Sequence, residues 1–338
     1  TINGVTGYAD YEQSTFDIGV KEDGTNRTLT VTADRSIKLK DRTIDGGSSA
    51  KLDVTLDSFN ASAATGGAVI MNAVTINSNG GDIVVGGKAA SASDYAFGYS
   101  SDSDGIYDGV EIFNTSMNSS GGDIYISGNT ATDSAGGAGV QIYGLGTITS
   151  AGGNLYIDGK VTSSSTAGNK DAVVIGEDSN SQVTLSATGA GNISIKGDAS
   201  GVVGATSGSR YDGVLIASGA LIQTDTGNIT ITGLGGSGAD DSFISDENHG
   251  IKLKTNNTRI LSTSGTITLQ GTSGGKTGSY GIYSDGNTMY IGDDSTVTYT
   301  GDINLISDSM FFTNTSSSRL QVASASPGEL YIRPLTTS

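Results

Sequence analysis

The chain has 338 residues, of which 52 are Gly and only 2 are Pro, and it contains no Cys and no Trp. Without cysteine there is no disulfide framework and no thiol chemistry. Because there is no cysteine and His249 is the single histidine, neither a cysteine–histidine pair nor a histidine-rich metal site can form. The net charge is -17 and the basic residues are scattered, which argues against nucleic acid and anionic membrane surfaces as partners.

The composition favours an all-β protein, because Gly is abundant and strong helix formers are scarce. No apolar run approaches the roughly 20 residues of a membrane helix, so we expect no membrane insertion. Thr1 opens directly into polar sequence without a signal peptide, which indicates a mature chain or a fragment of a longer one.

The first part of the chain predicts short strands joined by short connections. Alternating apolar and polar residues mark strands at 29–31, 37–39 and 52–54, followed by GGAVI at Gly66 and VTIN at Val74. We interpret residues 28–85 as the N-terminal repeats of a solenoid.

A Gly-rich turn that runs directly into a strand then recurs along the chain. Its copies are GGDIVV at Gly80, GGDIYI at Gly121, GGNLYI at Gly152, GNISI at Gly191, GNITI at Gly227, SGTITL at Ser264 and GDINL at Gly301. Successive copies lie 31 to 41 residues apart, a period typical of stacked supersecondary units.

Two further strands are expected within each repeat. The second strand is marked by GVEI at Gly109, GVQI at Gly139, AVVI at Ala172, GVLI at Gly213, GIKL at Gly250 and GIYS at Gly281. The third strand is expected at 148–149, 183–185, 221–224, 260–263 and 297–300, and the last strands at 320–322 and 330–332.

Three short strands per repeat, each with one apolar face, predict a triangular rung. Rungs stacked about 4.8 Å apart pair like strands in parallel. The predicted fold is therefore a right-handed parallel β-helix of about ten rungs. We expect one domain over residues 1–338, with long loops along one edge between 86 and 300. We expect residues 301–338 to form the last rungs, which lack a polar cap and indicate truncation.

The motif LTVTADRSI at Leu29, followed by GGAVIMNAVTINSNGGDIVVGG, resembles the filamentous-haemagglutinin-type exoproteins of the two-partner secretion pathway. The resemblance extends from about Leu29 to Ile332 and implies a β-helical surface or secreted protein of Gram-negative bacteria. It implies adhesion or filament display as the function, with contact-dependent toxin delivery as a variant. It also implies an outer-membrane transporter as a partner. The family's secretion domain and its Asn-Pro signatures have no counterpart here, because neither Pro327 nor Pro334 follows an Asn.

The long loops all join the first strand of a rung to the second, so stacking places them along one edge of the rod, where solenoids commonly bind partners. The loop between Gly86 and Asp108 is rich in Tyr and Asp, which suit sugar recognition by ring stacking and hydrogen bonding. The candidate residues for binding host or neighbour-cell glycans, or a surface receptor, are Tyr95, Tyr99, Tyr107, Asp108, Arg210, Tyr211 and Asp212. His249 and Tyr280 occupy equivalent positions, so a row of rings is expected. Alternatively, the loop packs on its own rod as a satellite cluster.

Calcium is a candidate ligand of the same loop. Asp102, Asp104 and Asp108 resemble part of a calcium loop, although the distal Glu is missing. Two other functions remain open: a structural stalk or filament subunit without a ligand, and a polysaccharide-degrading enzyme using carboxylates such as Asp240 and Asp241. Neighbouring residues of a strand point to opposite faces, so we expect no enzyme.

Overall fold

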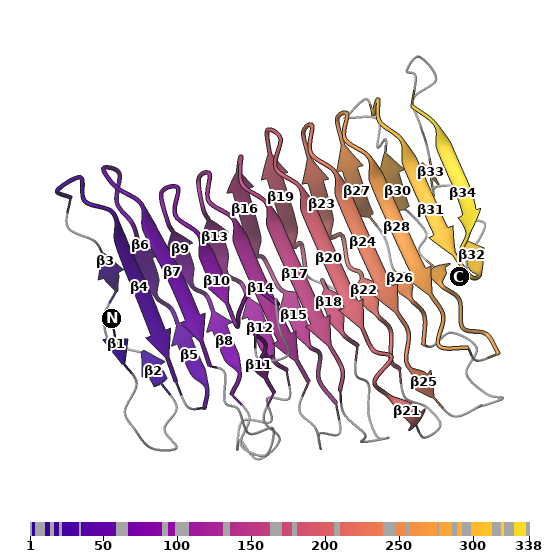
Figure 1. The fold of residues 1–338 in the computed structure, drawn as a ribbon, viewed down its shortest axis with the longest axis horizontal. Helices are drawn as coiled ribbons and strands as arrows, with labels where there is room; N and C mark the ends of the chain where they lie inside the picture. Colours follow the sequence, from indigo (N-terminus) through magenta and orange to yellow (C-terminus); the bar gives the residue numbers. More distant parts are fainter. Residues whose placement is uncertain are drawn as a thin grey trace.

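The computed structural model describes residues 2–3, 11–13, 17–19, 22–33, 35–58, 67–89, 94–98, 108–130, 136–162, 171–177, 181–205, 210–238, 248–254, 257–275, 277–285, 289–292, 299–312, 319–320 and 328–335. They form a rod of three parallel sheets, A, B and C, in which each turn of the chain adds one strand to each sheet (Figure 1). This confirms the right-handed parallel β-helix. Across the described ranges, no helix has the length and apolar character needed to cross a membrane.

Sheet A contains the strands that open at the Gly-rich turns. In order along the rod it consists of β1 (Ile2–Asn3), β4 (Arg27–Thr32), β7 (Leu52–Asp57), β10 (Ile83–Val85), β14 (Ile124–Asn129), β17 (Leu155–Lys160), β20 (Ile193–Asp198), β24 (Ile229–Leu234), β28 (Ile267–Thr272), β31 (Ile303–Ser307) and β34 (Leu330–Pro334). Beside it, β11 (Ala96–Phe97) pairs with β14, and β21 (Val203–Ala205) pairs with β25 (Ser237–Gly238) as a separate small sheet.

Within the described residues, sheets B and C have ten strands each, in agreement with the expected number of rungs. Sheet B consists of β2 (Tyr11–Gln13), β5 (Ile37–Lys40), β8 (Val69–Asn72), β12 (Val110–Phe113), β15 (Val140–Tyr143), β18 (Val173–Ile175), β22 (Val214–Ile216), β26 (Ile251–Leu253), β29 (Ile282–Ser284) and β32 (Met310–Phe312). Sheet C consists of β3 (Ile18–Gly19), β6 (Thr43–Asp45), β9 (Thr75–Asn77), β13 (Ser116–Asn118), β16 (Thr147–Ala151), β19 (Thr184–Thr188), β23 (Leu221–Thr224), β27 (Thr258–Ser262), β30 (Met289–Gly292) and β33 (Arg319–Leu320).

The core is made of apolar columns that run along the rod. In sheet A, the first apolar residue after each Gly-rich turn pairs in register with its counterpart in the next rung, as in the series Ile124, Leu155, Ile193, Ile229 and Ile267. None of these side chains is more than 1% exposed. Burying apolar surface at about 25 cal/mol per Å² makes these columns the main stabilising element.

An Asp or Asn in most of the Gly-rich turns links one rung to the next, whereas the turn at Ser264 has Thr266 at this position. Asp82 accepts a hydrogen bond from the backbone N–H of Asp123 (3.0 Å), and Asp123 accepts one from the N–H of Asn154 (2.7 Å). Asn154, Asn192 and Asn228 continue the series in the same direction. The recurring polar residue therefore satisfies the backbone of the following rung, where strand pairing has not yet begun.

A second column of glycines defines the corner where sheet A turns toward sheet B. Its members pair in register at the ends of their strands and are Gly128, Gly159, Gly197, Gly233 and Gly271. At each position a Cβ atom would lie well under 3.0 Å from a backbone carbonyl oxygen at the start of sheet B. The corner therefore closes only because these residues have no side chain.

The sequence prediction placed the third strand of one rung wrongly. It was expected at 297–300, whereas the sheet C strand of that rung is β30, several residues earlier. Of the predicted segment, Val297 and Thr298 lie outside the described residues, and Tyr299 is buried with its hydroxyl donating to the Gly265 carbonyl (2.9 Å). Tyr299 thus packs in the core beside the Gly-rich turns and does not extend sheet C.

The long connections occupy the expected place in most rungs. In the rungs that begin with β10, β14, β17, β20 and β24, the longest connection joins sheet A to sheet B. In the rung that begins with β28, the connection from β30 to β31 is slightly longer. We call the corner between the ends of the sheet A strands and the starts of the sheet B strands the A–B edge.

Candidate functional site

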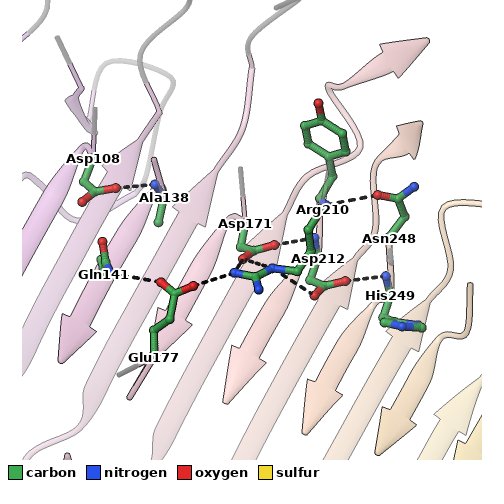
Figure 2. A network of polar contacts seen from close by, with 10 residues as sticks. Asp108, Ala138, Gln141, Asp171, Glu177, Arg210, Asp212, Asn248 and His249 are labelled. Carbon is green, nitrogen blue, oxygen red and sulfur yellow. Dashed lines mark hydrogen bonds and ion pairs between the residues drawn. The ribbon is translucent and has the colours of Figure 1, made fainter. Parts of the chain in front are cut away.

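Along six successive rungs, the A–B edge carries a column of residues just before the sheet B strands, and all of them except Ala138 have polar or ionisable side chains. Its members are Asp108, Ala138, Asp171, Asp212, His249 and Tyr280, each followed by a Gly or Ala and then by the first strand residue. Figure 2 shows most of this column and its partners. Stacking of the rungs brings Asp108, Arg210 and Asp212 of the predicted site to one edge.

Side chains of this column bind the backbone of the next rung. Asp108 accepts a hydrogen bond from the N–H of Ala138, Asp171 from the N–H of Asp212 (2.8 Å), and Asp212 from the N–H of His249 (2.7 Å). The Nδ1 atom of His249 accepts one from the N–H of Tyr280 (3.0 Å). Nδ1 of His249 therefore carries no proton.

Arg210 lies at the centre of an ion network (Figure 2). Its Nη2 atom lies 2.6 Å from Asp171 and 2.8 Å from Glu177, and its Nε atom lies 3.7 Å from Asp212. Gln141 donates to the other oxygen of Glu177 (3.2 Å). The side chain of Arg210 is 11% exposed, while those of Asp171 and Asp212 are 2% and 0% exposed. One guanidinium thus holds two buried carboxylates.

Burial and the neighbouring charges shift the pKa values of the ion network. Burial raises the pKa of Asp171 above its usual range, the Arg210 charge opposes this, and the Asp212 charge adds to it. The carboxylates, Asp171 foremost, raise the pKa of Arg210, which stays charged. Separated from their partner, these carboxylates would carry a large desolvation cost.

A small hollow opens beside the network. It has a volume of about 290 Å³, and its lining includes the backbone at Gly136 and Gly137 and the side chains of Gln141, Glu177 and Arg210. Guanidinium, carboxylate and amide groups together offer donors and acceptors in a small space. Such a lining is suited to a ligand rich in hydroxyl groups.

Tyr95 lies inside the A–B edge. Its ring is 1% exposed, its hydroxyl donates to Asp158 (2.9 Å), and the Lys160 ammonium lies 4.2 Å from the ring centroid. The next residues form β11, which pairs with Gly128 and Asn129 of β14. This part of the long connection packs on the rod, as in the alternative interpretation, and its ring does not face solvent.

Tyr211 is also buried, at 0% exposure. It belongs to a satellite cluster with Val161, Ala172, Ala199 and Val202, and its backbone N–H donates to the side chain of Asn248 (3.1 Å). The large ring fills the space beneath the edge. The contact surface that we propose below therefore omits Tyr95 and Tyr211.

A row of stacked rings that includes His249 and Tyr280 of the expected row lies nearer the C-terminal end. His249 stacks on Tyr283 with centroids 4.2 Å apart, and Tyr280 stacks on Phe311 at 5.2 Å. His249 and Tyr283 are 0% and 3% exposed, whereas Phe311 is 41% exposed. Most of this row is a packing element of sheet B.

Tyr99, Tyr107, Asp102 and Asp104 lie outside the described residues. Asp108, the last member of the predicted calcium set, is 7% exposed and is engaged with the N–H of Ala138. Within the described ranges, no group of three or more His, Cys, Asp or Glu side chains is placed to hold a metal ion. Calcium binding by the long loop stays a prediction.

Asp108 makes the stability of the folded chain depend on pH. Burial raises its pKa to about 7, with the charges of Glu111 and Glu177 acting in the same direction and the N–H of Ala138 opposing. The unfolded value is about 3.9. Between these values the folded state binds more protons than the unfolded state, so this contribution to stability falls as pH rises and levels off above about pH 7.

We expect Asp108→Asn to remove this dependence, because Asn keeps an acceptor oxygen but cannot ionise. Three pKa units correspond to about 4 kcal/mol, so the variant should gain stability of that order at pH 8 and none at pH 4. Thermal melts of both proteins between pH 4 and pH 8 test this. An equal difference in melting temperature at every pH would contradict it.

No family model, no curated protein and no solved structure matches the chain in comparisons of its sequence and fold. The resemblance to filamentous-haemagglutinin-type exoproteins is therefore supported by the parallel β-helix and by the quoted motifs alone.

Asp171, Glu177 and Gln141 are the edge residues that the sequence prediction missed. Asp171 occupies the same position in its rung as Asp108 and Asp212, directly before the second strand. Aligning the repeats on that strand would have placed it in the column. Glu177 follows β18 and gives no comparable signal in the sequence.

Proposed function

We propose that this chain is a segment of a bacterial cell-surface or secreted adhesin of the filamentous-haemagglutinin type. In this proposal the β-helix is a rigid scaffold, and the A–B edge binds glycans or a surface receptor on a host or neighbouring cell. The observation that supports it most is the polar hollow beside Arg210 on the edge where successive long connections begin.

The hollow offers a chemical basis for sugar binding. The amide of Gln141 and the carboxylate of Glu177 can bind neighbouring hydroxyl groups of a pyranose, and Arg210 adds further N–H donors. Tyr99 and Tyr107, from the long connection before β12, are proposed as the apolar contacts. The role is binding and not catalysis. Export through an outer-membrane transporter, by a separate secretion domain, belongs to the same proposal.

An oligosaccharide array tests this function. We expect the wild-type chain to bind a defined set of printed glycans. The bound glycan should be held about three- to tenfold more weakly by Gln141→Ala, which removes one hydrogen-bonding group. Thr230→Ala, an exposed strand residue of sheet A, is the matched control. Arrays run with calcium and with chelator test the proposed cation. A blank array for the wild type in both conditions would refute glycan binding by the A–B edge.

A structural stalk or filament subunit without a ligand of its own is the second candidate. The continuous apolar core that joins the stacked rungs into a rod favours it. A blank array, together with a mass that rises with concentration in light scattering, would favour this function.

A further inference from the structure

Sheet C, the sheet that takes no part in the A–B edge, has a hollow of about 430 Å³ on its outer face. Thr184, Leu221, Arg259 and Tyr290 lie along it at equivalent positions in β19, β23, β27 and β30. The hollow thus spans four successive rungs. Its volume lies within the range of small-molecule sites, about 300–1,000 Å³.

The hollow exists because side-chain size changes along this column. The preceding rungs have short hydroxyl side chains at the same position, as in Thr75, Ser116 and Thr147. Arg259 and Tyr290 are long and form a wall. The hollow therefore begins where the column changes from short to long side chains.

Gly219 opens the floor of the hollow. It lies between Gln182 and Asn257, and a Cβ atom there would meet only the carbonyl oxygen of Ser181, at 3.8 Å. Its φ is +72°, a conformation that favours Gly and that Asn tolerates. The space where a side chain would lie is thus open between two amide side chains.

We propose that this hollow binds a short oligosaccharide. The half-buried ring of Tyr290 gives an apolar face on which one pyranose stacks. Gln182 and Asn257 each offer both donors and an acceptor to its hydroxyl groups, and Arg259 adds a planar set of donors. This inference rests on the proposed adhesin function and deepens it, because it places a second glycan site on another face of the rod.

Titration calorimetry with the glycan best bound on the array tests the site. We expect Tyr290→Ala to weaken binding by about tenfold, the size expected for loss of ring stacking. Gly219→Asn should also weaken it, because the new side chain fills the floor while the backbone conformation is retained. The control is Tyr156→Ala, a tyrosine 36% exposed on sheet A, which should bind like the wild type.

The outcomes separate this inference from the function on which it rests. If the wild type binds a glycan, and both Tyr290→Ala and Gly219→Asn bind it equally well while keeping the wild-type melting temperature, the sheet C site is refuted and the adhesin function stands. If the wild type binds no printed glycan, both the sheet C site and glycan binding at the A–B edge are refuted. Loss of binding in Tyr156→Ala to the same extent would also refute the sheet C site.

Discussion

Gly233→Ala is expected to destabilise the rod by about 3–5 kcal/mol, at the upper end of single substitutions. The new Cβ atom would lie well under 3.0 Å from the carbonyl oxygen of Gly250. Gly233 is paired in register with both neighbouring rungs, and the Gly250 carbonyl accepts a hydrogen bond from the N–H of Val214. No rotamer change relieves a contact of this kind. Strand β24 must shift, at the cost of its hydrogen bonds to β20 and β28. Urea unfolding followed by circular dichroism measures the loss.

Gly19→Ala is the matched control, because a Cβ atom at Gly19 has nothing within 4 Å and the residue also lies in a strand. We expect its stability to lie within about 0.5 kcal/mol of the wild type. Equal stability of Gly233→Ala and Gly19→Ala would show that the A–B corner relaxes freely, contrary to the packing described here.

Arg210→Met is expected to cost about 3–5 kcal/mol at pH 8, because it leaves the buried carboxylates of Asp171 and Asp212 without their cation. The loss should be smaller at pH 5. Burial already raises the pKa of Asp171, and removal of Arg210 raises it further, so this carboxyl is protonated and uncharged at the lower pH. Thermal melts at the two pH values measure both effects.

Asp171→Asn provides the control for this prediction. Combined with Arg210→Met, it removes one of the two uncompensated charges and keeps the acceptor oxygen for the N–H of Asp212. The double variant should therefore recover part of the stability at pH 8. An Arg210→Met protein as stable as the wild type at pH 8 would mean that the network does not hold the edge together.

The fold was predictable because one local sequence motif recurs from rung to rung and forms the same turn and strand each time. The Gly-rich turn, the Asp or Asn after it and the alternating strand are each visible in the sequence, and together they determine the register of sheet A. The exception is instructive: Val297, Thr298 and Tyr299 have strong strand propensity, yet the third strand of that rung contains Ile291, which pairs with the core residue Ile260. Stacking on the preceding rung overrides local propensity.

The candidate site was predictable only in part. The sequence indicated the edge and brought Asp108, Arg210 and Asp212 to it, because their positions follow from the repeat. It could not indicate that Tyr95 and Tyr211 are buried, since burial within a long connection depends on contacts with other rungs and not on periodicity. The hollow on sheet C was missed because it depends on how side-chain size changes from one rung to the next at one position of the repeat. Thr184, Leu221 and Arg259 occupy that position in three neighbouring rungs.

The series of side-chain acceptors gives the rod a direction. In the Gly-rich turns, Asp82 accepts a hydrogen bond from the N–H of Asp123, and Asn192 accepts one from the N–H of Asn228. At the A–B edge, Asp212 accepts one from the N–H of His249. In each case the acceptor belongs to the earlier rung and the donor to the later one. A folded rung therefore presents side-chain hydrogen-bond acceptors to the backbone of the segment that follows it in the chain. This arrangement favours folding that proceeds rung by rung from the N-terminal end.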